Sequence, residues 1–393
     1  MPSPNLEIRR VRWAVSLIFL ANGLSFASLV PHFPWLKEKL MLSEATMGIA
    51  LLFPAIGAVT MMLLTGRLIQ RFGSKALTIL GGLVLQACVP LILLMPDLWT
   101  LAPLLVGVGA MIGMMDVSMN AQAAVVESRY GQPIMSSFHA TWSLGTLTGG
   151  ASASLLLGVG LTPLQHVTSI TVFLFVLILV CGKVLLPHSE DIPGDDTPVI
   201  AIPKGPVLAM GLLAMMGMVS EGAATDWSAI YASTVLEATP SQAAATFTVF
   251  TLTMTTGRFT GDWLVRRFGR DRMVQIAAGL GAGGLAIGLA GGTLESAWFG
   301  FACLGFGLAN VVPILFSASS QIPGVSAGTG IAGVATLGYF GFLFGPPLIG
   351  FTAEWLGLRV ALFLIVAFCL VLALVAPRLL GASASPAPAP SKA

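Results

Sequence analysis

Long, almost uncharged apolar stretches alternate along this chain with short polar segments. Each stretch has roughly the 20 residues that a helix needs to cross a hydrocarbon layer about 30 Å thick. The pattern predicts one membrane-spanning helix in each of these ranges: 12–33, 45–66, 76–95, 101–126, 134–158, 164–186, 207–231, 243–265, 273–292, 296–320, 326–350 and 356–380. We therefore expect an all-α membrane protein with twelve transmembrane helices.

A polar segment divides these helices into two sets of six. Residues 187–206 contain acidic side chains and several prolines, a composition that favours water and excludes a helix interior. We expect a six-helix bundle over 1–186, a cytoplasmic linker over 187–206 and a second six-helix bundle over 207–381. Residues 382–393 are rich in proline, alanine and serine, so we expect a disordered tail.

A short motif recurs at matching places in the two sets. Arg71-Phe72-Gly73 follows the second predicted helix, and Arg267-Phe268-Gly269 follows the eighth. Ser43 and Thr239 hold matching positions just before those helices. The two halves therefore look like duplicates in parallel orientation, a common plan of membrane transporters.

Composition and charge support the membrane assignment. Hydrophobic residues make up 56% of the chain and charged residues 9%, and the mean hydropathy is +0.90. An ordinary soluble domain is excluded by these values. The net charge of +2 is spread over many loops, so we expect no nucleic-acid partner.

The distribution of basic residues predicts the orientation. If both termini are cytoplasmic, only Lys37, Lys39 and Arg359 of the 19 lysines and arginines lie on the outer side. Such an asymmetry is what the positive-inside rule requires. We expect a multi-pass protein of the cell inner membrane with both termini in the cytoplasm.

The repeated basic loop carries a family resemblance. A glycine-marked basic loop lies between the second and third helices of each half and resembles the signature loop of the major facilitator superfamily. The resemblance to this superfamily covers nearly the whole chain. Residues 116–127, 138–150 and 220–231 are similar to a bacterial branch related to sugar permeases of the fucose/proton symporter type. The resemblance implies two pseudo-symmetric six-helix bundles and secondary-active transport.

Residues in and near the two repeated loops are candidates for a conformational latch. Their glycines permit close helix approach and a tight turn, and their basic side chains can bind carbonyls at helix C-termini or acids on neighbouring helices. The set is Gly66, Arg71, Gly73, Arg258, Asp262, Arg267 and Gly269. Arg258 and Asp262 stand four residues apart and can pair with each other. A plain positive-inside anchor is the alternative.

Ionisable residues deep in apolar helices are candidates for proton coupling, because a charge there normally faces a cavity or a partner. Asp116 lies roughly 22 Å from the outer end of its helix at 1.5 Å per residue. His139, on the next helix, is expected near the depth of Asn120, so it can form a proton relay with Asp116 or a static clamp. Glu221 is the second deep acid.

Polar and aromatic residues on the same helices are candidates for solute binding, because amides bind hydroxyl groups and a ring can cover the apolar face of a sugar. Each amide can instead bond neighbouring helices to each other. Trp227 and Tyr231, beside Asp226, fit either an outer gate or an interfacial aromatic belt. The set is Asn22, Asn120, Gln122, Trp142, Asp226, Trp227 and Asn310.

Enzyme chemistry and cofactors find no support in the sequence. Gly279, Gly281 and Gly284 match a dinucleotide fingerprint only by letter, because they lie in an apolar span without a preceding strand. Gly182-Lys183 lacks the hydroxyl residue of a Walker loop, and the four histidines have no metal-ligand spacing. We expect no cofactor, no metal and no enzymatic activity.

The function predicted from the sequence is proton-coupled symport of a small, sugar-like polar solute by alternating access. Sodium is the alternative coupling ion, and the expected partners are the solute and membrane lipid, with the protein working as a monomer. Proton-driven efflux of hydrophobic or cationic drugs competes with this prediction, because methionine and phenylalanine can form an adaptable apolar pocket. A non-transporting receptor or scaffold is the alternative from another class.

Overall fold

The computed structural model describes residues 6–383 except 132–133, 191–203, 320, 323–324 and 326. This part of the chain is helical and contains no strand. In chain order its elements are α1 (Leu6–Leu29), the 3₁₀ turn η1 (Val30–His32), α2 (Phe33–Lys39), α3 (Glu44–Phe72), α4 (Ser74–Ile92), α5 (Leu98–Tyr130), α6 (Met135–Gly158), α7 (Pro163–Gly182), the 3₁₀ turn η2 (His188–Glu190), α8 (Gly205–Val235), α9 (Pro240–Phe268), α10 (Arg270–Gly291), α11 (Leu294–Leu308), α12 (Val311–Ser319), α13 (Ala327–Leu356) and α14 (Leu358–Ser383).

Ten helical segments of the described chain are long and apolar enough to cross a membrane. Two of them combine shorter elements, because α1 with η1 and α2 forms one segment and α11 with α12 forms another. The long helices α6 and α9 are not among the ten, and α9 is rich in threonine, which lowers its hydropathy. With α6 and α9 included, each of the twelve predicted ranges holds a helix, as the major facilitator fold requires.

Several predicted boundaries differ from the structure, including the end of the second span, which continues to Phe72. The first span continues through a 3₁₀ turn to Lys39, and the tenth is interrupted at Ala309 and Asn310. The last helix continues to Ser383, beyond the predicted end of the second bundle. Most of the predicted linker and the tail from residue 384 lie outside the described residues.

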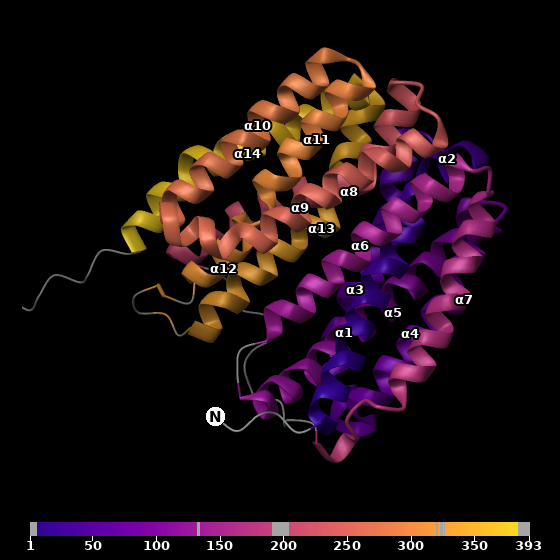
Figure 1. The fold of residues 1–393 in the computed structure, drawn as a ribbon. Helices are drawn as coiled ribbons and strands as arrows, with labels where there is room; N and C mark the ends of the chain where they lie inside the picture. The colour runs from indigo at the N-terminus through magenta and orange to yellow at the C-terminus, as the bar shows by residue number, and fades with distance from the viewer. Residues whose placement is uncertain are drawn as a thin grey trace, which may run out of the picture.

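The helices form two bundles, α1 to α7 and α8 to α14, which lie side by side in Figure 1. Inside the first bundle α1 packs on α6, and inside the second α8 packs on α13 in the same manner. A side chain at Gly145 or Gly149 would meet the backbone of α1, and one at Gly341 would meet the backbone of α8. Glycines therefore allow a close helix crossing in both halves.

The second helix of each half begins and ends in the same way. Ser43 caps α3 by accepting a hydrogen bond from the Thr46 amide, and Thr239 caps α9 by accepting one from the Gln242 amide. Gly73 and Gly269 end these helices with φ angles of +83° and +82°. The sequence repeat is therefore also a repeat of local structure.

Successive spans alternate in direction, so α1 and α8 start at one end of the molecule, the linker end, and α3 and α9 start at the opposite, distal end. The halves touch at the distal end through hydrogen bonds that we call the distal seam. The Ala45 amide donates to Glu354 Oε2 at 3.1 Å. Ser154 Oγ donates to the Ser241 carbonyl at 3.1 Å, and Ser241 Oγ returns a bond to the Ser154 carbonyl at 2.8 Å.

Candidate functional site

A charged group joins the two halves near the middle of the bundle. Arg258 Nη2 on α9 lies 2.9 Å from Glu221 Oε1 on α8. Arg258 Nη1 donates to Ser143 Oγ on α6, in the other half, at 3.3 Å. The side chains of Arg258 and Glu221 are 31% and 19% exposed. We call Ser143, Glu221 and Arg258 the central cluster.

The packing of α6 on α9 brings the central cluster together. Gly150 lies against the ring of Phe247, so the two helices approach closely on the distal side of the cluster. The Thr255 hydroxyl donates to the Ser143 carbonyl at 3.4 Å, one helical turn before Arg258. A side chain at position 258 of α9 therefore points at α6, and the long arginine stem lets its charge reach both halves.

His139 lies beside this cluster. Its ring is exposed, makes an edge contact with the ring of Phe19 at 5.4 Å, and lies within electrostatic range of Arg258. Because Ser143 Oγ also donates to the His139 carbonyl, consecutive turns of α6 present both residues to the central cluster. Of the predicted proton-coupling residues, Glu221 contacts the Arg258 guanidinium and His139 lies within electrostatic range of it.

Asp116 lies on another side of the space between the halves. It is half-buried on α5, and its Oδ1 accepts a bond from Asn120 Nδ2 at 3.4 Å. Tyr339 of α13, whose side chain is 43% exposed, lies within electrostatic range of Asp116. Asp116 therefore faces the other half, and its predicted relay with His139 stays a prediction.

The spacing of Asp116, Asn120, Ala123 and Glu127 places them on one face of α5 and suggests a polar, hydrated path to the linker end, but the structure does not support this expectation. Ala123 is completely buried. Glu127 Oε2 accepts hydrogen bonds from the backbone amides of Ile134 and Met135 at 2.7 and 2.6 Å. This carboxylate satisfies free amides at the start of α6, so its position has a structural cause.

Two of the predicted solute-binding amides bond helices inside the N-terminal half. Gln122 is 1% exposed, donates to Ser74 Oγ at 2.6 Å and to the Leu186 carbonyl at 3.0 Å, and accepts from the Leu186 amide at 3.0 Å. Asn22 Oδ1 accepts a bond from Trp142 Nε1 at 2.9 Å. The alternative of bonding between neighbouring helices therefore describes both.

Asn310 has a similar role in the C-terminal half. Its Nδ2 donates to the Gly257 carbonyl at 2.7 Å, and its amide fills the place that a side chain at Gly261 would take. Asn310 stands at the interruption between α11 and α12, so it bonds this non-helical point to α9. Gly261 therefore leaves room on α9 for the Asn310 side chain.

Trp227 and Tyr231 are completely buried within the C-terminal half, so the interpretation as an interfacial aromatic belt is wrong. The Tyr231 ring lies 6.4 Å from that of Phe301 on α11. Asp226, next to them on α8, is half-buried. Asp226, Trp227 and Tyr231 lie roughly 8 to 15 Å beyond Glu221 along the helix, toward the distal end.

The predicted latch residues have different surroundings in the structure. Gly73 forms the expected tight turn, and Lys75 Nζ bonds the carbonyls of Lys183 and Leu185 at the end of α7. At Gly66 no atom lies within 4 Å of the place of a side chain, so the predicted close approach is wrong there. Arg71 stacks on Phe72.

The remaining latch residues belong to the second half. Arg267 is exposed, and Gly269 has the same turn conformation as Gly73. The side chain of Asp262 lies outside the described residues, so its predicted pairing with Arg258 stays a prediction. The guanidinium of Arg258 belongs to the central cluster.

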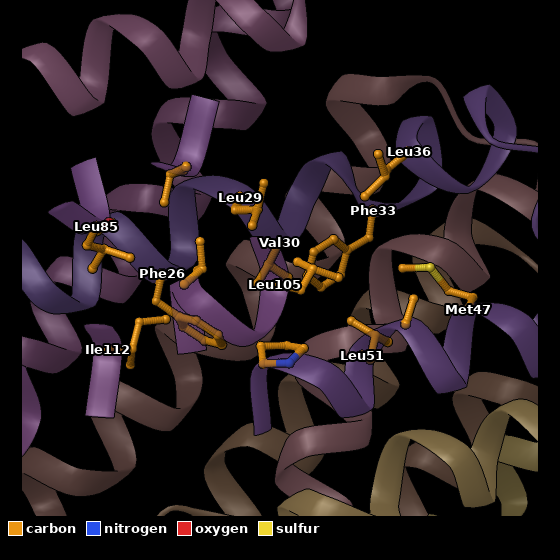
Figure 2. A pocket seen from close by; sticks show the side chains of 15 residues that line it. Phe26, Leu29, Val30, Phe33, Leu36, Met47, Leu51, Leu85, Leu105 and Ile112 are labelled. Carbon is orange, nitrogen blue, oxygen red and sulfur yellow. The ribbon is translucent and has the colours of Figure 1, made fainter. Parts of the chain in front are cut away.

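A small apolar cavity lies within the N-terminal half, away from these groups. Its volume is about 50 Å³, and Figure 2 shows the side chains of Phe26, Phe33, Met47 and Leu105 among those around it. Solute sites usually measure roughly 300 to 1,000 Å³. We therefore assign this cavity to helix packing.

Sequence reasoning missed several residues that the structure connects. Ser143 of α6 bonds Arg258 of the other half, and Tyr339 of α13 lies within electrostatic range of Asp116. A second group is buried in the N-terminal half, where His32 Nε2 lies 2.8 Å from His166 Nδ1 and His166 Nε2 lies 3.0 Å from Ser152 Oγ. Because these residues belong to different helices, no local sequence pattern predicts their contacts.

Known proteins resemble this chain in sequence, and others resemble it in fold. An uncharacterised MFS-type transporter of Yersinia pestis is 37% identical over 88% of this chain and 89% of its own length. The membrane protein MosC of Rhizobium meliloti is 33% identical over 92% of this chain and 88% of its own length.

Solved structures show the same fold at lower identity. A bacterial homologue of the human lysosomal transporter Spinster, in an inward-facing and unoccupied conformation, matches with a TM-score of 0.76 and 14% identity over 98% of this chain and all of its own. A mutant of the nucleoside transporter NupG matches with a TM-score of 0.72 and 11% identity over 95% of this chain and all of its own. The sequence profile of the Major Facilitator Superfamily matches residues 15–338. The chain therefore belongs to the Major Facilitator Superfamily, a family of membrane transporters and not of enzymes.

Proposed function

We propose that the protein moves a small, sugar-like polar solute across the bacterial inner membrane by proton-coupled symport. The observation that carries this proposal is the central cluster, in which the Glu221–Arg258 ion pair of one half is bonded to Ser143 of the other. Charged groups within the bilayer are costly and therefore usually mark a functional site. This ion pair lies where the two halves must separate and meet during transport.

The proposed solute site lies between the halves. His139, the central cluster and the group of Asp116 and Asn120 supply its ionisable and polar groups, and Trp142 supplies a half-buried ring. Asn22, Gln122, Asn310 and Trp227 are left out because they are buried in helix packing. The resemblance to fucose/proton symporter-type permeases supports a hydroxylated solute.

In the proposed cycle the two halves rock around this site. The distal seam closes one side, and the basic loops at the linker end, with Arg71 and Arg267, act as the latch of the other side. The excess of basic residues at the linker end supports a cytoplasmic position for this end, for the linker and for both termini. We propose that one monomer, made of the two bundles, is the transporting unit.

The coupling proposal is tested with purified protein in liposomes. Uptake of radiolabelled sugars is measured with an imposed inward proton gradient, and solute exchange is measured without one. Glu221→Gln and Asp116→Asn should each abolish accumulation driven by the gradient and retain exchange, because a neutral side chain cannot release a proton. Glu38→Gln, an exposed acid on α2, is the matched control and should transport normally.

Other results of the liposome experiment would support other mechanisms or functions. Full gradient-driven uptake by both variants would remove Glu221 and Asp116 from the coupling mechanism, and dependence on a sodium gradient would replace the proton. Efflux of cationic dyes in place of sugar uptake would establish the antiporter. Absence of any gradient-driven flux would favour a receptor or scaffold.

A further inference from the structure

The central cluster holds its arginine in a way that suits a second carboxylate. Two of the five N–H donors of a guanidinium account for the contacts of Arg258 with Glu221 and Ser143. Both of these contacts are made through single atoms, whereas a guanidinium and a carboxylate can form two parallel hydrogen bonds. The side chain of Arg258 is 31% exposed, so a solute between the halves can reach it.

The depth of Arg258 separates it from the other basic residues of α9. It stands ten residues before the end of the helix, roughly 15 Å from the linker end at 1.5 Å per residue. Arg266 and Arg267, in contrast, lie in the last turn and are exposed. A cation at this depth strongly attracts an anion, because the surrounding medium screens charge less than water does.

We propose that the transported solute is a small hydroxylated monocarboxylate, and that its carboxylate replaces Glu221 on Arg258. This inference rests on the proposed function and names the solute class of the same site. The Ser143 hydroxyl contacts the guanidinium, the exposed ring of His139 lies within electrostatic range of it, and both can bind hydroxyl groups of the solute. The bound solute then bridges the two halves, as the contact of Arg258 with Ser143 does when no solute is bound.

Charge balance makes this exchange a coupling step. The contact of Arg258 with Glu221 breaks, and the contact of Arg258 with the solute carboxylate forms. Glu221 would then remain as an unpaired anion in a poorly solvated place, which is costly. One proton from the aqueous phase therefore binds the Glu221 carboxylate, so one proton and one anion move together without net charge.

The inference is tested by ligand binding to the purified full-length protein. Glucuronate, glucose and glucosamine share a pyranose ring and differ in charge, and glycerate, gluconate and lactate extend the series of monocarboxylates. Thermal unfolding reports binding, because a ligand that binds only the folded state raises the unfolding temperature. We expect stabilisation by at least one carboxylate, and none by glucose or glucosamine.

Variants make the test specific for the ion exchange. Arg258→Gln should weaken carboxylate binding about 30-fold or more, as loss of one partner of a desolvated charge pair does. Glu221→Gln should bind the carboxylate without taking up a proton, whereas the unaltered protein should take up one proton per anion, measured with a pH dye in weak buffer. Arg266→Gln, an exposed cation on the same helix, is the control and should bind normally.

The outcomes separate this inference from the proposed function. Stabilisation by glucose or glucosamine alone, no stabilisation by any of the carboxylates, or unchanged binding by Arg258→Gln would each overturn the inference of an anionic solute. Gradient-driven uptake of a neutral or cationic sugar in the liposome assay would leave the symporter intact. Failure of the symporter itself would show as the absence of gradient-driven flux for every solute.

Discussion

Gln122, inside the N-terminal half, is bonded differently from the central cluster, which joins the two halves. Gln122 is almost completely buried, and two of its three bonds go to the backbone of Leu186. Arg258 and Glu221 are partly exposed, and their bonds join side chains only. The first kind of contact fixes one arrangement of helices, whereas the second can change partners without unfolding a helix.

The largest effect on stability is expected at Gln122. Gln122→Leu removes three hydrogen bonds and leaves the amide and carbonyl of Leu186 without their side-chain partner. We expect the free energy of unfolding in micelles to fall by about 3 kcal/mol. Gln70→Leu, at an exposed site of α3, is the control, and an equal effect of both changes would contradict the structural role of Gln122.

The buried histidine pair provides the next test of the interior. His166→Phe removes the group that connects His32 with Ser152, so we expect a loss of about 2 kcal/mol in the free energy of unfolding. His166→Gln keeps a donor and an acceptor and should lose less. Equal stability of the Phe variant and the unaltered protein would show that these contacts do not hold α6, α7 and η1 together.

The distal seam should show an intermediate effect, on conformation as well as on stability. Replacing Ser154 and Ser241 together by alanine removes two hydrogen bonds between the halves, worth about 1 kcal/mol each. We expect a larger population in which the distal ends are apart. Spin-label distances between Val159→Cys and Glu295→Cys, in a background without the native cysteines, measure this population.

The control for the distal seam is Ser169→Ala, because Ser169 bonds only the preceding turn of its own helix in the described contacts. It should leave the distance distribution unchanged. If the double variant gives that same distribution, the two serines do not contribute to closure.

The smallest effect on stability is expected at Ser143. Ser143→Ala removes two long hydrogen bonds, one from Arg258 and one to the His139 carbonyl within the same helix, and Arg258 keeps its contact with Glu221. The free energy of unfolding should change by less than about 0.5 kcal/mol, while gradient-driven uptake decreases because the bridge between the halves is lost. A large loss of stability with normal uptake would contradict this comparison, because Ser143 would then have a structural role like that of Gln122.

Hydropathy was sufficient to predict the helices, because each span must satisfy its own backbone in lipid. It could not predict the interruption at Asn310, whose side chain bonds the backbone of a different helix. The same limit applies to the first span, which continues to Lys39 through the 3₁₀ turn. Both exceptions depend on tertiary contacts that no hydropathy window contains.

Helical geometry alone could have improved the choice of site residues on α5. Asn120 follows Asp116 by four residues, about 40° around the helix, whereas Gln122 follows by six, about 240°. Asp116 and Gln122 therefore face different neighbours, and only Asp116 faces the other half. The same angular test separates Glu221 from Asp226, which follows it by five residues, about 140° around the helix.

The contacts of the central cluster could not be predicted from the sequence. Glu221, Arg258 and Ser143 belong to three helices, and their meeting depends on how each helix is rotated in its bundle. The same is true of Tyr339 and Asp116. A sequence reveals which residues are costly in a membrane, but packing decides which of them become partners.

Gly73 and Gly269 end the second helix of each half with ψ angles of 150° and 159° and positive φ, a combination open in practice only to glycine. A turn of this kind at equivalent places is what duplication of one six-helix unit would leave in both halves. The two halves nevertheless use their polar residues differently, because the N-terminal half contains the closely bonded Gln122 and the C-terminal half holds the charge pair.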